Sequence, residues 1–205
     1  MEDNSAAFGE APAVAQKRQP SGSRMELYDW VQCVVTAVVF GILLFVFVGR
    51  TIGVEGDSML QTLHNEDRVI MWSLFYAPTN GDVVIIKTDS YGDKPLVKRV
   101  IAVGGQTVDI NFDTSEVTVD GTVLTELYIN EPTREQLSFK GPVTVPEGHV
   151  FVMGDNRNRS LDSRSESVGF IDVRNVLGKV LLVAVPGKDE FGLRDWSRFG
   201  SVYGD

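Results

Sequence analysis

At 205 residues the chain can hold one ordinary domain with appendages, and its formal net charge of -9 argues against a nucleic-acid-binding protein, which needs a basic face. The single cysteine excludes a disulfide framework, and with only two histidines we find no ligand spacing for a metal site. We therefore expect neither a metal nor any other cofactor, and no nucleic-acid partner.

The N-terminal part divides into a polar tail and an apolar segment. Residues 1–28 are predicted to be a disordered tail, because most of this stretch is rich in Ala, Ser, Gly, Pro and charge and lacks an apolar face. From Trp30 to Val48 the sequence WVQCVVTAVVFGILLFVFV carries no charge and is long enough to cross about 30 Å of hydrocarbon. We predict a transmembrane helix over residues 29–49.

Two other interpretations of the apolar segment fit less well. A cleavable signal peptide would be followed by small residues in an Ala-x-Ala pattern, which FVGRTIG does not offer. A buried core helix fits less well still, because the segment is apolar on all sides. Lys17, Arg18 and Arg24 precede the segment, so the positive-inside tendency predicts a cytoplasmic N-terminus and an extracytoplasmic body. The expected location is the cell membrane, spanned once, with the lipid bilayer as a partner.

The body after the apolar segment is predicted to be all-β, built from antiparallel sheets. β-branched runs, period-two alternation and glycine or proline between the runs are typical of short strands. Asp120-Gly121 is a strong signal for a tight hairpin, and a short helix is predicted over Asp172–Val176. The predicted strand segments are 82–88, 96–103, 107–112, 116–124, 149–155 and 178–185.

The strand LVKRVIAV carries one cation on each face, Lys98 among Leu96 and Val100, and Arg99 among apolar neighbours on the other side. One interpretation is an edge strand whose long side chains reach water. The other is a buried lysine, whose pKa desolvation lowers until the neutral amine can accept a proton.

Ser58 follows soon after the apolar segment, in VEGDSMLQTLHNEDRVI, and a serine needs a neighbouring base to become a nucleophile. His64 and His149 lie in polar loops and form no convincing Ser-His-Asp arrangement. A Ser-Lys pair is a known variant, although spacing alone does not prove that Ser58 and Lys98 meet.

A dense polar loop follows the strand at HVFVM, in the sequence GDNRNRSLDSR from Gly154 to Arg164. Such residues favour a solvated turn. Alternatively, its acids and arginines lock together through charge-assisted hydrogen bonds.

Four segments in order resemble the bacterial type I signal peptidases: GDSMxxTL (56–63), GDVVIIK (81–87), VKRVIAVGGQ (97–106) and GDNRxxSxDSR (154–164). YINEP (128–132) and VGFI (168–171) are also similar to that family. The resemblance implies a signal-peptidase-like fold, with an extracytoplasmic catalytic β-domain over 50–187, a smaller β-subdomain inserted at about 106–148, and a C-terminal tail over 188–205. We expect that tail either to dock on the body or to stay disordered.

The resemblance also implies the activity and the roles of the site residues. The protein would be a membrane-anchored serine endopeptidase that removes signal peptides from exported pre-proteins. Ser58 would be the acylating nucleophile, with its N–H as an oxyanion donor, and Lys98 the general base. The supporting residues would be Ser160, which orients the lysine amine, Arg99 with Asp155, and Asp162 with Arg164.

The sequence departs from the family pattern in two places. Gln61 stands where the family has proline, and we expect a less rigid turn behind the nucleophile. Gly56 stands where some members have a serine whose hydroxyl completes the oxyanion hole, so a second donor must come from elsewhere.

The family resemblance implies that the substrate binds as an extended strand, with small residues one and three positions before the cut. The side chains expected to line its pockets are Met59, Val83 and Ile85.

Two alternatives remain. A self-cleaving repressor-type protease shares the Ser-Lys chemistry, but would carry a DNA-binding domain and no apolar anchor. A non-catalytic membrane-tethered β-domain would not need Ser58, Lys98, Ser160 and Asp155 together.

Overall fold

The computed structural model describes residues 22–88 and 94–203, without the side chains of 22–25 and 43–49. The chain divides into two compact units, Met1–Ile42 and Leu43–Asp205. The predicted tail over 1–28 falls mostly on residues outside this description. Helix α1 spans Gly22–Val48 and begins before the predicted membrane segment.

The predicted transmembrane segment is helical, but its ability to span a membrane is not confirmed. In the part of the chain whose side chains the structure describes, no helix is both long enough and apolar enough to cross a bilayer. The last part of the predicted segment, residues 43–49, lies outside the described side chains.

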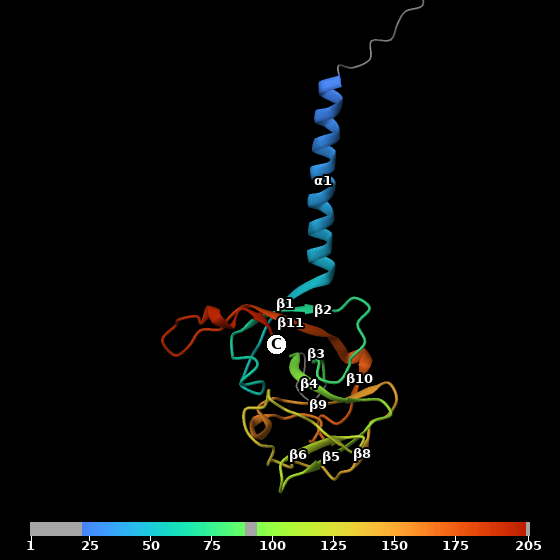
Figure 1. Ribbon diagram of the computed structural model, residues 1–205, viewed down its shortest axis with the longest axis vertical. Coiled ribbons are helices and arrows are strands. Elements are labelled where there is room, and N and C mark those ends of the chain that lie inside the picture. The colour runs from blue at the N-terminus through green and yellow to red at the C-terminus, as the bar shows by residue number, and fades with distance from the viewer. Residues whose placement is uncertain (1–21, 89–93, 204–205) are drawn as a thin grey trace, which may run out of the picture. The chain divides into compact units, whose positions relative to one another are not determined.

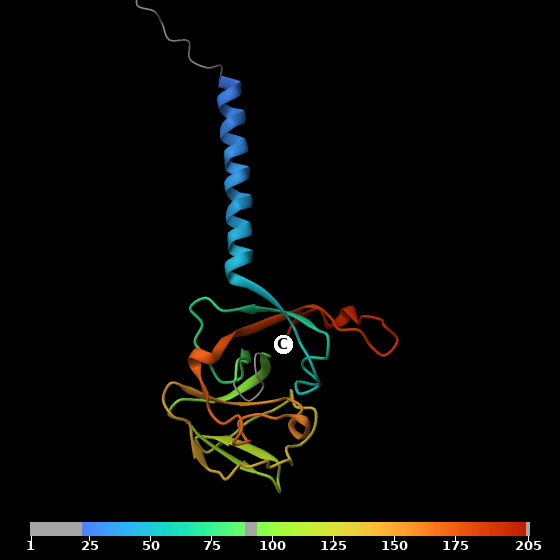
Figure 2. The same ribbon diagram turned by 180° about the vertical axis from the view of Figure 1, so that it is seen from behind.

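The second unit consists of two antiparallel sheets, which confirms the all-β prediction for the body. The larger, 8-stranded sheet has the order β1-β2-β11-β3-β4-β9-β10, with β12 paired to β11, and the 4-stranded sheet has the order β7-β6-β5-β8. Figure 1 and Figure 2 show β5 and its neighbours at one end of this unit and the β1–β2–β11 side at the other. The strands are β1 (Gly49–Gly53), β2 (Arg68–Trp72), β3 (Val83–Ile86), β4 (Leu96–Val103), β5 (Thr107–Asn111), β6 (Glu116–Val119), β7 (Thr122–Val123), β8 (Val143–Thr144), β9 (His149–Met153), β10 (Ile171–Asp172), β11 (Val176–Val185) and β12 (Gly200–Ser201).

Local sequence accounts for the turns between these strands. Asp120 and Gly121 have φ of 51° and 77°, and two successive positive φ values match the tight hairpin predicted between β6 and β7. The helix predicted over Asp172–Val176 is a single 3-10 turn, Val173–Asn175. Asp172 caps this turn by accepting a hydrogen bond from the Arg174 N–H at 2.8 Å.

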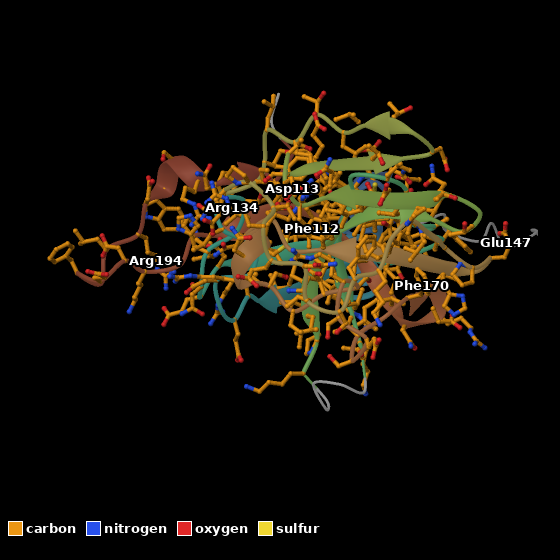
Figure 3. All side chains as sticks on the ribbon, turned by 90° about the horizontal axis from the view of Figure 1, so that it is seen from below. Phe112, Asp113, Arg134, Glu147, Phe170 and Arg194 are labelled. Atoms are coloured by element: carbon orange, nitrogen blue, oxygen red, sulfur yellow. The ribbon has the colours of Figure 1, made fainter. Side chains whose placement is uncertain are left out.

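The hydrophobic core divides into three clusters, and each of them includes residues of β4. One part packs the loop between β1 and β2 onto β2, β3 and β11. Another packs β4 and β9 against the smaller sheet and contains a row of four aromatic rings with centroids 6.1, 5.9 and 6.2 Å apart. Figure 3 labels the two ends of this row, Phe112 and Phe170. The row also contains Phe139 and Phe151.

Strand β4 lies between β3 and β9, and six of its eight residues are buried. The edge-strand interpretation of LVKRVIAV is therefore wrong, because Lys98 and Arg99 are only 3% and 4% exposed. Both cations belong to the interior of the larger sheet, where each needs a specific partner or a shifted pKa.

The C-terminal segment, residues 186–203, docks on the body as far as the structure describes it. Strand β12 pairs with β11, and Val202 is 9% exposed within the core. Tyr203 donates its hydroxyl proton to the Val180 carbonyl and accepts from the Val83 N–H, both at 3.0 Å. In Figure 3 Arg194 marks the projecting loop of this segment.

Candidate active site

Ser58 lies in the loop between β1 and β2, which is anchored at its base and through apolar side chains. The Val54 N–H donates to the Asp67 carbonyl at 2.8 Å and joins the two ends of the loop. Met59 is 1% exposed and Leu63 is fully buried in the core beneath. Because Met59 adjoins Ser58, this packing fixes the backbone from which the hydroxyl projects.

Gly56 supplies the turn that leads into Ser58. Its φ of 85° lies in the left-handed region, which favours glycine. Its N–H donates to the Asn65 side-chain oxygen at 2.9 Å. The glycine is thus explained by backbone conformation.

Lys98 reaches from β4 to the loop between β1 and β2, which we call the nucleophile loop after the predicted role of Ser58. Its Nζ lies 2.7 Å from Ser58 Oγ, within hydrogen-bonding distance, although 40 residues separate the two in the chain. This is the contact that the sequence could propose but not establish.

Burial lowers the pKa of the Lys98 amine to about 8, and Asp162 and Asp155 oppose that shift only in part. The Arg164 charge lowers the same pKa further. An amine with this pKa is substantially neutral near pH 8, so it can accept the Ser58 proton without leaving its buried position.

Arg99 is held by a network of its own. Its guanidinium donates to both carboxylate oxygens of Asp155, at 2.8 and 2.7 Å, and to the Gly81 carbonyl at 2.8 Å. The Thr62 hydroxyl donates to Asp155 at 2.5 Å, and the Tyr128 ring lies 3.9 Å from the guanidinium carbon. The network connects β4, the nucleophile loop and the polar loop after β9.

Asp162 and Arg164 hold the polar loop in shape. Arg164 donates to both oxygens of Asp162 at 2.9 Å, and both side chains are fully buried. Asp162 also accepts from the Gly154 N–H at 3.0 Å. The solvated-turn interpretation of this loop is wrong, since four of its charged side chains, Asp155, Arg157, Asp162 and Arg164, are buried and paired.

The polar loop touches the nucleophile loop at Gly154. A Cβ on Gly154 would lie 2.3 Å from Ser160 Oγ and 2.5 Å from the Ser58 carbonyl oxygen, so only glycine fits here. Ser160 is therefore close to the nucleophile backbone. Among the described residues its buried hydroxyl has no hydrogen-bond partner, whereas the Lys98 amine contacts Ser58. The orientation of that amine by Ser160 stays a prediction.

Comparison with known proteins agrees with this geometry. The family model described as signal peptidase, peptidase S26, matches residues 27–185. The chain belongs to the signal peptidase S26 family. It is a serine peptidase and thus a hydrolase.

Individual members of the family are similar over most of the chain. A signal peptidase I from Bacillus licheniformis is 36% identical over 180 residues, covering 83% of this chain and 95% of the relative. Signal peptidase I S from Bacillus subtilis is 33% identical, with the same coverage. A crystal structure of a signal peptidase I from Enterococcus faecalis is 31% identical and covers 51% of this chain and 97% of its own, with a TM-score of 0.43.

A small cavity opens beside Ser58 in this S26 peptidase. Met59 lines it, whereas Val83 and Ile85 are fully buried in the core and are not among its lining residues. Its volume of about 100 Å³ suits a small side chain. The lining residues are Gly53, Val54, Glu55, Ser58, Met59, Lys94, Pro95, Leu96 and Val97.

Sequence reasoning missed several residues that shape the site. Arg157 is fully buried and pairs with Glu126, which also accepts the Tyr128 hydroxyl proton at 3.0 Å. Arg157 belongs to the recognised polar loop, but nothing in the sequence pairs it with an acid 31 residues away.

Asp67 joins the nucleophile loop to the C-terminal segment. Arg198 donates to both of its carboxylate oxygens, at 2.9 and 2.6 Å, and the Gly187 N–H donates at 2.7 Å. Burial alone would raise the pKa of Asp67, but these hydrogen bonds and one from the His64 N–H outweigh it and hold the pKa below its usual value. The C-terminal segment therefore braces the loop that carries Ser58.

Proposed function

We propose that this peptidase is a membrane-anchored endopeptidase that removes signal peptides from exported pre-proteins through a Ser58–Lys98 dyad. The observation that carries the proposal is the 2.7 Å separation between Lys98 Nζ and Ser58 Oγ, with the amine almost fully buried. Membership of the signal peptidase family supports the substrate class.

In the proposed acylation step, neutral Lys98 takes the proton from Ser58 Oγ as that oxygen attacks the scissile carbonyl carbon. The Ser58 N–H donates to the negative oxygen that develops, an interaction typically worth about 3 kcal/mol. When the tetrahedral intermediate collapses, the Lys98 ammonium gives its proton to the leaving amine. The carbon–nitrogen bond breaks and an ester to Ser58 remains.

Deacylation follows the same path with water in place of serine. Lys98 takes a proton from a water molecule, the hydroxide attacks the ester carbonyl, and the proton returns to Ser58 Oγ as the ester bond breaks. In this scheme Arg99, Asp155, Asp162 and Arg164 hold the loops, and Ser160 orients the Lys98 amine.

The anchor brings the enzyme to its substrate in this proposal. The uncharged run from Trp30 to Val48 would lie in the bilayer, with the N-terminus in the cytoplasm and the β-body outside. About ten residues then lead to Ser58, and a chain of that length reaches about 35 Å at most. A precursor whose signal peptide is still in the bilayer presents its cleavage site within this reach.

The cavity beside Ser58 supports a preference for small side chains next to the cut. The precursor would lie as an extended strand along this side of the site. Small residues one and three positions before the scissile bond would face the protein.

The test is cleavage of a precursor with an Ala-x-Ala site by the detergent-solubilised full chain. Ser58→Ala and Lys98→Ala are each expected to abolish cleavage. Ser138→Ala and Lys140→Ala serve as matched controls, because both residues are exposed, and should cleave like the wild type. Cleavage that survives either dyad substitution rules out the dyad.

A further inference from the structure

Asn156 makes two hydrogen bonds to the backbone on either side of Ser58. Its backbone N–H donates to the Ser58 carbonyl at 3.0 Å, and its side-chain Nδ2 donates to the Asp57 carbonyl at 2.9 Å. The residue is 1% exposed and precedes the 3-10 turn Arg157–Arg159. One residue of the polar loop thus holds two consecutive carbonyls of the nucleophile loop.

The bond to Asp57 has a consequence for the next amide. The Asp57 carbonyl and the Ser58 N–H belong to one planar peptide group, in which the two point in opposite directions. Fixing the carbonyl oxygen therefore fixes the direction of the Ser58 N–H. Among the hydrogen bonds of the described residues, this N–H donates none, so it is free to meet a substrate oxygen.

The same bond also strengthens the donor. A hydrogen bond accepted by the carbonyl polarises the peptide group and makes its N–H more positive. In a site with little solvent, a fixed donor needs no reorganisation when negative charge develops on the substrate.

The chemistry of the side chain suits this task. Asn156 Oδ1 is buried and has no partner among the described residues, so the Asp57 carbonyl alone orients the amide. An unpartnered buried oxygen weakens the fold, and an apolar side chain would avoid that weakness. The amide therefore loses stability at Oδ1 while its Nδ2 holds the Asp57 carbonyl.

We propose that Asn156 is the positioning residue for the oxyanion donor: through the Asp57 carbonyl, it aims and polarises the Ser58 N–H. The proposal rests on the proposed function, because the N–H matters only if Ser58 forms a tetrahedral intermediate. Asn156 itself touches no reacting atom.

The test compares Asn156→Ala and Asn156→Leu with the wild type in the full chain. Asn156→Leu keeps the number and branching of the side-chain heavy atoms and removes the donor, and either variant keeps the backbone N–H bond to Ser58. We expect kcat/KM for a peptide substrate to fall about 10- to 100-fold, mostly in kcat. A misdirected donor still gives part of the transition-state stabilisation that a deleted donor would lose completely. The pH midpoint of activity should not move, since Lys98 is not contacted.

Asn158 provides the matched control from the same loop. Its side chain accepts from the Arg134 and Glu135 N–H groups at 2.9 and 3.0 Å and donates to the Pro132 carbonyl at 3.1 Å. Those contacts belong to the loop before Ser138 and not to the nucleophile loop. Asn158→Ala should therefore leave kcat unchanged within about twofold, even if it lowers thermal stability.

A pair of inhibitors separates positioning from general structure. A peptide aldehyde forms a tetrahedral adduct with Ser58 Oγ and places a negative oxygen at the donor, whereas the matching peptide alcohol binds without an adduct. The Asn156 variants should lose aldehyde affinity by the same factor as kcat/KM and keep alcohol affinity.

Equal losses for aldehyde and alcohol, a shifted pH midpoint, or unchanged aldehyde affinity would each overturn the role of Asn156. Ser58→Ala distinguishes this failure from that of the proposed function. If Ser58→Ala binds the aldehyde as tightly as the wild type, the dyad proposal fails as well.

Discussion

Lys98 and Arg99 are neighbours on β4, and both are almost completely buried, but their surroundings have opposite effects. Among the described residues, Lys98 contacts a neutral hydroxyl and no carboxylate directly, and burial lowers its pKa to about 8. Burial also acts to lower the pKa of Arg99, but the hydrogen bonds and charge of Asp155 outweigh it and raise that pKa. Two adjacent cations of one strand thus have pKa values shifted in opposite directions, and the direct contact with Asp155 is what distinguishes Arg99 from Lys98.

The largest effect expected from this comparison is that of Lys98→Met. It should reduce kcat by about a thousandfold or more, because no base remains for Ser58. At pH 7 it should also raise the free energy of unfolding, by up to about 3 kcal/mol, because the wild-type amine is protonated less easily when folded. Both changes can be measured in one preparation, by peptide cleavage and by chemical denaturation.

The sign of the stability change follows from the lowered pKa. The wild type has its full stability above the ordinary lysine pKa of 10.5 and loses part of it as the pH falls from there to about 8. The gain in Lys98→Met should therefore disappear above pH 10.5. A gain of the same size at every pH would contradict a lowered Lys98 pKa.

Arg99→Met should give the opposite result in stability. Removing the cation leaves Asp155 buried without its main partner, and breaking such a pair typically costs about 3–5 kcal/mol. Denaturation of Arg99→Met, of Asp155→Leu and of the double variant tests this. If the pair acts as a unit, the double variant should be more stable than Arg99→Met. If the losses of stability in Arg99→Met and Asp155→Leu simply add in the double variant, Arg99 and Asp155 do not act as a pair. The contrast between a paired Arg99 and an unpaired Lys98 would then be unsupported.

The wild-type pH profile should sharpen the comparison further. If neutral Lys98 is the base, kcat/KM rises about tenfold per pH unit well below the midpoint and levels off above pH 8, with a total rise of about fiftyfold from pH 6 to pH 8. The measurement is peptide cleavage across this range at constant ionic strength. A profile that is flat from pH 6 to pH 9 would exclude a lysine base with this pKa.

The smallest effect is expected at a third buried charge, Asp67. Arg198→Ala removes two of its hydrogen bonds but leaves those from backbone amides, so we expect a loss of about 1–2 kcal/mol. Glu55→Gln, which breaks an exposed ion pair with Lys94, is the matched control and should change stability little.

The acid limb of stability offers a second measurement on Asp67. Because its pKa is lowered in the fold, the carboxylate contributes stability at neutral pH that is lost as the pH falls below its ordinary value. Arg198→Ala should weaken this contribution and unfold at a higher pH than the wild type. Identical acid unfolding curves for Arg198→Ala and the wild type would contradict the stabilisation of the Asp67 carboxylate by Arg198.

The parts of the fold that sequence could predict are those with a local signal. The period-two pattern of β5 and β6 and the Asp120-Gly121 turn are read directly from neighbouring residues. Strands β8, β10 and β12 have two residues each, which is too short for a detectable pattern. Strand β1 is the five-residue stretch GRTIG, which has a glycine at each end and no alternation of apolar residues. Whether β4 was central or at an edge depended on its neighbours β3 and β9 and not on its own residues.

The site was predictable to the extent that its residues share a motif. Ser58, Lys98 and the polar loop follow from their order and resemblance, and the resemblance could not supply distances. Asp67 and Arg198 are 131 residues apart and carry no pattern that pairs them. Asn156 stood inside the recognised loop, but its role lies in a hydrogen bond to a backbone carbonyl, which no side-chain motif encodes.

The docking of Tyr203 has a consequence for biosynthesis. Its hydroxyl group bridges β3 and β11, and Val202 fills the core beneath the nucleophile loop. Both residues leave the ribosome after every other part of that core. A nascent chain therefore cannot complete the support under Ser58 until translation has passed residue 203.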